Sequence, residues 1–285
     1  MEVVTDLAGY EPDRRGAVVT IGAYDGVHLG HQAVLRLVRE GATANGQAAV
    51  CLTFDRHPAE VVRPVSAPCL LTTLEQKLEL LAATGYVDTT AVLTFDETRS
   101  HEPAEEFVET VLVAGLNAKR VVVGAGTRSG SRRHGTVRLL EQMGAELGFE
   151  VVGLGLIPIV GDRGGTPYSS TEIRRLLAEG AVGAAAAMLG RPPRPYEVRG
   201  VVVRGDGRGR ELNFPTANVT PPDRTCLPAD GIYAGIFVAE DGVERIGAIS
   251  LGRRPTFYTD ADHSLLAVYE RRKAGYKPTV VVAGQ

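Results

Sequence analysis

The sequence predicts an α/β domain built on a parallel sheet, followed by a small antiparallel β-barrel. Apolar runs of strand length recur in the first two thirds of the chain, and segments with apolar residues at helical spacing separate them. From Tyr196 onward, short β-branched segments alternate with Gly-rich turns, which is typical of a small barrel. A Gly/Pro cluster at 190–195 cannot continue a helix, so we expect domains at 1–190 and 196–285.

The expected elements follow from these patterns. The runs expected to form the parallel sheet are 17–21, 47–54, 89–95, 120–124 and 150–157. Apolar spacing and capping residues predict helices at 33–39, 72–81, 103–112, 136–148 and from 170 onward. The expected barrel strands are 197–203, 231–238, 244–251, 265–269 and 279–282.

The composition excludes several classes of partner. The 285 residues carry a formal net charge of −3, so no strong field draws the chain to nucleic acid or a membrane surface. Cys51, Cys69 and Cys226 lack metal-ligand spacing and are odd in number, which is typical of reduced thiols. No apolar run approaches membrane-spanning length, and the chain does not begin with a signal-peptide pattern. We expect a cytoplasmic protein with small-molecule partners; association into a homo-oligomer is left open.

The segment 20–32, T-I-G-A-Y-D-G-V-H-L-G-H-Q, lies between the first apolar run and the first helical segment. Such a strand-to-helix turn directs backbone N–H groups and the positive end of a helix at one point, where anions bind. Glycines at 22, 26 and 30 allow a sharp turn and a close approach to a ligand.

Two histidines follow in this segment. If the helix has begun by His28, then His28 and His31 share one face near its N-terminus. Two imidazoles there can donate hydrogen bonds to phosphoryl oxygens as charge develops during nucleotidyl transfer. The simpler alternative is that one histidine caps the helix while the other is a solvated surface residue.

Two further segments offer groups for phosphate or metal. Phe54-Asp55-Arg56-His57-Pro58 follows the second apolar run and should face the same crevice, because ligands of open α/β sheets bind at the carboxyl ends of strands. Asp55 is a candidate metal or substrate ligand and His57 a candidate phosphate contact; the alternative is a plain loop that Pro58 ends. Downstream, Ser170 and Thr171 open a helix whose N–H groups suit phosphate, and Arg174 lies one turn further.

These motifs resemble those of a known family. H-x-G-H after a first strand marks the nucleotidylyltransferase superfamily related to class I aminoacyl-tRNA synthetases, and 22–32 resembles the opening motif of prokaryotic bifunctional riboflavin kinase/FAD synthetases. The resemblance implies a Rossmann-like domain that transfers AMP from ATP to FMN, giving FAD, with Mg²⁺ as cofactor. The family usually has Phe at the position of Tyr24. The site residues that the resemblance implies are catalytic His28, His31 and Arg174; nucleotide-binding Gly22, Tyr24, Asp25, Gly30, Ser170 and Thr171; and acceptor-binding Phe54, Asp55, His57 and Arg128.

The loop after the fourth apolar run departs from the family. Family members usually read V-G-x-(D/N)-F-R-F-G there, whereas this chain reads V-G-A-G-T-R-S-G over 123–130, so Thr127 and Ser129 replace the two aromatic residues. An isoalloxazine ring prefers a flat apolar surface. Arg128, Arg132 and Arg133 among small residues suit an anion better, or they are simply solvated. The acceptor is therefore FMN or another phosphorylated molecule, and the nucleotide is ATP or another such as CTP.

In the second domain, N-F-P-T-A-N over 213–218 resembles the family's riboflavin kinase signature G-F-P-T-A-N, with Asn213 in place of Gly. A Gly-rich loop from Gly205 to Arg210 suits nucleotide phosphate, and the Thr216 hydroxyl and Asn218 amide oxygen suit Mg²⁺. In the family a Glu acts as base eight residues after the Phe of Pro-Thr-Phe, and that position here is Leu265. The family's C-terminal helix, which closes the flavin pocket, has no counterpart before Gln285. We therefore expect weak or absent kinase activity.

Three hypotheses follow. The first is an ATP- and Mg²⁺-dependent nucleotidyltransferase of the FAD synthetase type. The second is a non-catalytic nucleotide- or flavin-binding protein, against which the His pair and Arg174 argue, because a binder needs no groups that stabilise a transition state. The third is a kinase that is active despite Leu265.

Overall fold

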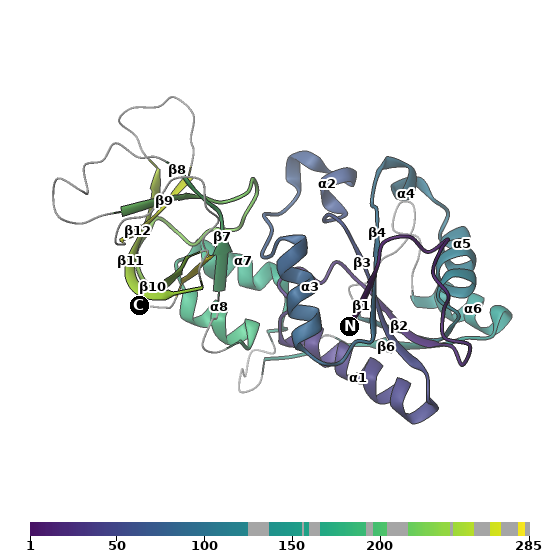
Figure 1. Ribbon diagram of the computed structural model, residues 1–285. Coiled ribbons are helices and arrows are strands. Elements are labelled where there is room, and N and C mark those ends of the chain that lie inside the picture. Colours follow the sequence, from purple (N-terminus) through teal and green to yellow (C-terminus); the bar gives the residue numbers. More distant parts are fainter. Residues whose placement is uncertain are drawn as a thin grey trace. The chain divides into compact units, whose positions relative to one another are not determined.

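The computed structural model describes residues 1–124, 137–155, 157–159, 166–191, 196–203, 216–239, 242–253, 263–268 and 279–282. The chain forms two compact units (Figure 1). The first unit comprises Met1–Pro68 and Thr72–Tyr168, and the second comprises Cys69–Leu71 and Ser169–Gln285.

The first unit contains a six-stranded sheet in the order β1-β4-β3-β2-β5-β6, and all of its pairings are parallel, as the alternation of strands and helices predicts. Its strands are β1 (Glu2–Val4), β2 (Ala17–Ile21), β3 (Ala48–Phe54), β4 (Thr89–Leu93), β5 (Ala118–Gly124) and β6 (Glu150–Leu154). Its helical segments are α1 (Leu29–Asn45), α2 (Ala59–Val62), η1 (Pro64–Ser66), α3 (Leu74–Ala83), α4 (Glu97–His101), α5 (Ala104–Phe107), η2 (Val108–Gly115) and α6 (Val137–Leu147). The edge strand β1 was not expected from the sequence, whereas β2 matches its prediction residue for residue.

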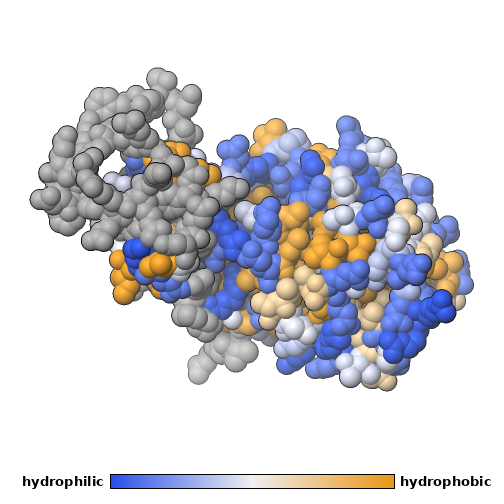
Figure 2. All heavy atoms as spheres, viewed as in Figure 1, coloured by the Kyte–Doolittle hydropathy of each residue, from blue (hydrophilic) through white to orange (hydrophobic). Residues whose placement is uncertain are grey.

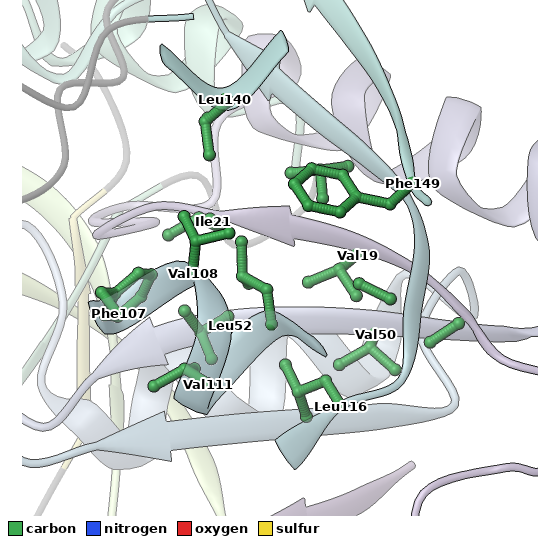
Figure 3. Packing of buried hydrophobic residues seen from close by; sticks show 14 of the residues in the cluster. Val19, Ile21, Val50, Leu52, Phe107, Val108, Val111, Leu116, Leu140 and Phe149 are labelled. Carbon is green, nitrogen blue, oxygen red and sulfur yellow. The ribbon is translucent and has the colours of Figure 1, made fainter. Parts of the chain in front are cut away.

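Alternate residues of the sheet pack on opposite faces. Val18 and Ala49 point to one side, where they pack with Val38 and Ala42 of α1. Val19, Ile21, Val50 and Leu52 point to the other side, where α5, η2 and α6 cover them with Phe107, Val108, Val111 and Leu140 (Figure 3). Both faces are dry because helices cover both, which explains the continuous apolar runs of the strands.

The helix expected over 103–112 begins as predicted after Pro103, but it continues as a π-helix, η2, to Gly115. The wide π turn places Val108, Val111 and Leu112 against the sheet in succession.

On the surface seen in Figure 2, hydrophilic residues cover most of the first unit, and apolar residues gather between α3 and β4.

Among its described residues, the second unit holds two helices and a seven-stranded antiparallel sheet in the order β7-β13-β10-β11-β12-β9-β8. The elements are α7 (Ser170–Ala178), α8 (Val182–Leu189), β7 (Tyr196–Arg199), β8 (Val201–Val203), β9 (Thr216–Thr220), β10 (Gly231–Val238), β11 (Glu244–Arg253), β12 (His263–Val268) and β13 (Thr279–Val282). The predicted change from parallel to antiparallel sheet is confirmed. Strand β9 was not expected from the sequence.

Helix α7 belongs to the second compact unit. The Ala229 N–H donates a hydrogen bond of 2.9 Å to the Leu177 carbonyl, so the segment before β10 is tied to this helix. The compact units therefore divide near Tyr168, upstream of the Gly/Pro cluster. The expected domain bounds, 1–190 and 196–285, stay a prediction.

Candidate active site

The turn from β2 into α1 has an unusual backbone. The Val27 N–H donates to the Tyr24 carbonyl, closing a four-residue turn in which Gly26 has a φ of +85°, as a type II turn requires. Tyr24 and Val27 also have positive φ, +50° and +39°, although neither residue favours that region. Both side chains are buried with Leu35, Cys51 and Leu81, and Gln32 donates to the Val27 carbonyl, so the surroundings hold the strained backbone in place.

His28 is the N-cap of α1, and the helix begins at Leu29. The sequence predicted that the two histidines share a helix face if the helix has begun by His28, which is one residue earlier. Its Nδ1 accepts a hydrogen bond of 3.3 Å from the His31 N–H. In the neutral ring the proton therefore lies on Nε2, which makes that nitrogen a hydrogen-bond donor. Capping by one histidine was the simpler alternative to a catalytic role. In the structure the cap also determines that Nε2 is the ring nitrogen that can donate a hydrogen bond.

The two imidazoles lie together as predicted, although they do so by stacking. Their ring centroids are 3.7 Å apart with an interplanar angle of 19°. The Tyr24 ring lies against the second imidazole, 4.9 Å between centroids, and its hydroxyl is 2.7 Å from Thr20 Oγ1. Burial raises the pKa of Tyr24 well above its ordinary value, so the phenol stays neutral. His28, His31 and Tyr24 form one column of rings at the N-terminus of α1.

Two glycines of the motif are needed for space. A Cβ on Gly30 would lie 3.1 Å from His28 Cε1 and 3.1 Å from the Tyr168 Cβ. A Cβ on Gly22 would lie 3.0 Å from the Tyr24 ring. Neither residue has a positive φ, so only Gly26 of the three is required by the backbone conformation of the turn; a close approach of these glycines to a ligand stays a prediction.

Asp25 is engaged with the segment before α3. Its Oδ1 accepts hydrogen bonds from the Thr72 N–H at 3.0 Å and the Thr72 hydroxyl at 3.1 Å, and the Gly26 N–H donates to Thr72 Oγ1 at 3.1 Å. These bonds span 46 or 47 residues of sequence, so no local pattern could have shown them. The carboxylate, only 5% exposed, holds the turn in place. Nucleotide binding by Asp25 stays a prediction.

The loop after β3 lies at the same end of the sheet. Asp55 Oδ1 accepts a hydrogen bond of 2.9 Å from the Phe95 N–H, and the Phe54 and Phe95 rings meet edge to face, 5.1 Å between centroids. Burial alone would raise the pKa of Asp55, but hydrogen bonds from Phe95 and Arg56 outweigh it and hold the pKa below its usual value. The sequence had not singled out Phe95.

His57 has the same arrangement as the first histidine of the motif. Its Nδ1 accepts from the Ala59 N–H at 3.1 Å, which again leaves the proton of the neutral ring on Nε2. Its backbone N–H donates to Glu60 Oε1 at 2.9 Å, so the loop is ordered by its own bonds. A phosphate contact from His57 remains a prediction.

Lys77 is a residue of this region that the sequence analysis did not assign. It lies on α3, is 7% exposed, and donates to oxygens at the carboxyl ends of both β2 and β3. One signal was available: Lys77 lies at helical spacing from Leu74 and Leu81, on the apolar side of the helix, where a charged residue is uncommon.

The residues of the second unit that are predicted to bind phosphate lie at the start of α7. Ser169 is the N-cap, and its side chain accepts from the Glu172 N–H at 3.1 Å, so Ser170 and Thr171 are the first helical residues. Arg174 Nε donates to the Cys69 carbonyl at 2.7 Å. That bond fixes the position of the guanidinium plane one turn into the helix.

Among the residues proposed for the kinase reaction, Thr216 and Asn218 lie on β9. The Thr216 side chain is exposed and that of Asn218 is 7% exposed, so they differ in access to solvent. Arg128, Gly205 and Arg210 lie outside the described residues. In the part of the chain that the structure describes, no three His, Cys, Asp or Glu side chains gather in a way that could hold a metal ion.

Comparison with known proteins defines the class. Residues 10–170 match the family model described as FAD synthetase, and residues 192–280 match the model described as riboflavin kinase. The first unit is therefore a nucleotidyltransferase of the α/β type, joined to an antiparallel unit of the riboflavin kinase type. The chain belongs to the family of bifunctional riboflavin kinase/FMN adenylyltransferases.

Two curated relatives have the description of this family, and one solved structure shares the fold. The bifunctional riboflavin kinase/FMN adenylyltransferase of Escherichia coli K12 is 35% identical over 85% of this chain and 75% of its own length. The protein of the same description from Pseudomonas fluorescens is 35% identical over 91% of this chain and 80% of its own length. A crystal structure described as a macrolide-efflux protein from Streptococcus pneumoniae superposes with a TM-score of 0.81 at 25% identity, covering 99% of this chain and 90% of that one. Among the described residues, no helix is long and apolar enough to span a membrane.

Proposed function

We propose that this chain transfers AMP from ATP to FMN and releases pyrophosphate. An oxygen of the FMN phosphate attacks the α-phosphorus of ATP, the bond from that phosphorus to the bridging oxygen breaks, and FAD forms. The observation that carries the proposal is the stacked pair His28 and His31 at the N-terminus of α1, with the first ring holding its proton on Nε2. A donor and a positive helix end at one point suit the charge that develops on the α-phosphate.

Each predicted residue has a role in this proposal. His28 and His31 donate to the oxygens of the reacting phosphate, while Ser170, Thr171 and Arg174 hold the leaving phosphates. Gly22, Tyr24, Asp25 and Gly30 shape the nucleotide site, and Phe54, Asp55, His57 and Arg128 face the acceptor. Two observations support these roles: the chain belongs to this family, and the turn from β2 into α1 ends in the His28 cap of the helix.

Mg²⁺ fits this reaction through the nucleotide. The ion usually keeps several waters and is held by substrate phosphates with one or two protein oxygens, so a dedicated cluster of ligands is not required. Asp55 is the carboxylate at this end of the sheet whose pKa is held low, and it would supply such an oxygen. When bound, Mg²⁺ neutralises charge on the triphosphate.

We also propose that riboflavin phosphorylation by the second unit is weak, because Leu265 stands where the family has a base. Thr216 and Asn218 remain the proposed metal ligands of this unit, and Gly205 and Arg210 its proposed phosphate contacts. Incubation with riboflavin and ATP should give little FMN. Rapid formation of FMN would show that the unit works without a carboxylate at position 265.

The main test measures pyrophosphate release from ATP or CTP with FMN or other phosphorylated acceptors. We expect release with ATP and FMN, and formation of FAD in equal amount, as for a cytoplasmic enzyme with access to both substrates. Release with another pair would keep the reaction and change the substrate. ATP binding without release for any acceptor would favour a non-catalytic binding protein instead.

A further inference from the structure

Lys77 has all three of its ammonium hydrogens matched by an acceptor. Its Nζ lies 2.7 Å from the Phe54 carbonyl, 3.2 Å from Thr53 Oγ1 and 3.3 Å from the Ala23 carbonyl. A lysine ammonium has three donors and no acceptor, so the three oxygens saturate it. The side chain is 7% exposed, and it is therefore part of the interior of the first unit.

The three acceptors lie where the ladder between β2 and β3 ends. The last bond of the ladder runs from the Gly22 N–H to the Leu52 carbonyl, at 3.1 Å. Beyond it, Ala23 leads into the nucleotide turn and Phe54 leads into the acceptor loop. Lys77 takes over from the ladder, since its ammonium joins the two segments after their backbones have stopped pairing.

Stability alone gives little reason for a charge here. Burial lowers the pKa of Lys77, and the negative charges of Asp25, Asp55 and Glu60 oppose that shift. A buried ammonium is costly, and a neutral donor at this position of α3 would satisfy the same oxygens without that cost, whereas an apolar residue would deprive two backbone carbonyls of this donor. A carbonyl-binding cation at the junction of two functional loops therefore points to a role in the reaction.

We propose that Lys77 is a positioning residue, which sets the nucleotide turn (residues 22–28) at the correct distance from the acceptor loop (residues 54–57). The proposal rests on the nucleotidyl transfer proposed above. In that reaction ATP and FMN occupy different loops, and the attacking oxygen must lie in line with the α-phosphorus. A misplacement of about 1 Å between two reactants can lower a rate by about 100-fold.

The test separates binding of each substrate from reaction between them. In Lys77→Met, each loop keeps its own contacts, so the dissociation constants of ATP alone and FMN alone should change less than about threefold. The value of kcat for pyrophosphate release should fall by about 10- to 100-fold, because only the relative placement is lost. Thr53→Val removes one of the three acceptors and should lower kcat by a smaller factor. The part of its effect that runs through the ammonium should vanish when it is added to Lys77→Met, whereas the loss of the hydrogen bond of 3.3 Å that the Thr53 hydroxyl itself donates to the Ala23 carbonyl should persist.

The matched control is Val38→Ala, which removes buried side-chain volume from α1 in a cluster that contacts neither loop. It should lower thermal stability while leaving kcat unchanged at a temperature where the protein is fully folded. If Lys77→Met keeps kcat, or loses it only through weaker binding of one substrate, the positioning role is wrong. A kcat loss that Val38→Ala reproduces would assign Lys77 to stability.

A second readout does not depend on the reaction. Hydrogen exchange of the backbone amides should rise in 22–28 and 54–57 together in Lys77→Met, and in neither segment in Val38→Ala. If the wild type releases no pyrophosphate, the proposed function fails, and the exchange experiment still decides whether Lys77 joins the two loops. Unchanged exchange in both segments would overturn the inference.

Discussion

The two ends of the parallel sheet use the same backbone conformation in different ways. At the amino end, the residues with positive φ are Asn117 (+49°), before β5, and glycines, among them Gly16 (+93°), before β2. Both residue types favour that region, and Asn117 also donates from its side chain to the Asp13 carbonyl. At the carboxyl end, Tyr24 and Val27 adopt it beside Gly26, although neither residue type favours it.

Charge follows the same division. At the amino end, Arg39 donates to both carboxylate oxygens of Asp88, at 2.7 and 3.0 Å, and the Asp88 side chain is 47% exposed. At the carboxyl end, Lys77 is 7% exposed and bonded to neutral oxygens. At the amino end, residue types therefore occupy the backbone conformations and the degree of exposure that they usually favour. At the carboxyl end, where the proposed reaction takes place, Tyr24, Val27 and Lys77 do not.

The largest expected effect tests the carboxyl end. His28→Asn keeps a good N-cap but removes the imidazole, so kcat for pyrophosphate release should fall by about 100- to 1000-fold. The free energy of unfolding, measured with urea, should change by less than about 0.5 kcal/mol. His28→Ala should lose the same activity and a further ~1 kcal/mol of stability from the missing cap. Full activity in His28→Asn would reduce this histidine to a cap.

A glycine-to-alanine substitution should have different consequences at the two ends of α1: it should lower kcat at Gly30 and raise stability at Gly41. In Gly30→Ala the new Cβ would press on the His28 ring and on Tyr168, and we expect kcat to fall by roughly tenfold as the ring moves. In Gly41→Ala the nearest atom is the flexible end of Arg120, so the change should stabilise the helix by up to about 1 kcal/mol. Steady-state kinetics and urea unfolding of both variants check the pair; equal kinetics would mean that the ring accommodates the Cβ.

A third experiment measures what holds the Tyr24 ring in place. Thr20→Val leaves the buried phenol hydroxyl without this partner, which should cost about 1–3 kcal/mol of unfolding free energy. The double variant Thr20→Val with Tyr24→Phe removes both polar groups and should recover most of that loss. A double variant as unstable as the single one would show that the hydrogen bond is not the cause.

The smallest effect concerns the amino end. Burial alone would raise the pKa of Asp88, but hydrogen bonds from Arg39 and the Ala49 N–H outweigh it and lower the pKa. Its contribution is therefore full above the unfolded-state pKa of about 3.9 and disappears as the pH falls through the lower folded-state value. Asp88→Asn should lose at most about 1 kcal/mol near neutral pH, because the pair is half exposed, and less near pH ~3. A loss that does not depend on pH would assign the effect to the neutral hydrogen bonds.

Much of the fold could be predicted because local signals carry it. The strands at 17–21, 231–238 and 279–282 have the bounds expected from apolar and β-branched runs, and Thr73 with Gln76 forms the capping box that starts α3. The edge strand β1 could not be predicted, since three residues paired with β4 leave no periodic pattern.

The site was predictable in its motif but not in its supports. The two histidines of the turn were recognised from spacing, whereas the hydrogen bonds from Thr72 to Asp25 and from Lys77 to Phe54 join segments far apart in the sequence. Such contacts depend on how the chain folds back, which single-residue preferences do not encode. The exact start of α1, at Leu29 and not at His28, could not be predicted either, because sequence patterns place helix ends only to within one or two residues.

The strained turn has a consequence for how a ligand would be received. Holding Tyr24 and Val27 at positive φ costs on the order of 1–3 kcal/mol each, and burying each side chain offsets a similar amount. The loop thus reaches its shape during folding, before any nucleotide arrives. Association then immobilises few additional bonds, and a larger share of the contact energy is expressed as affinity.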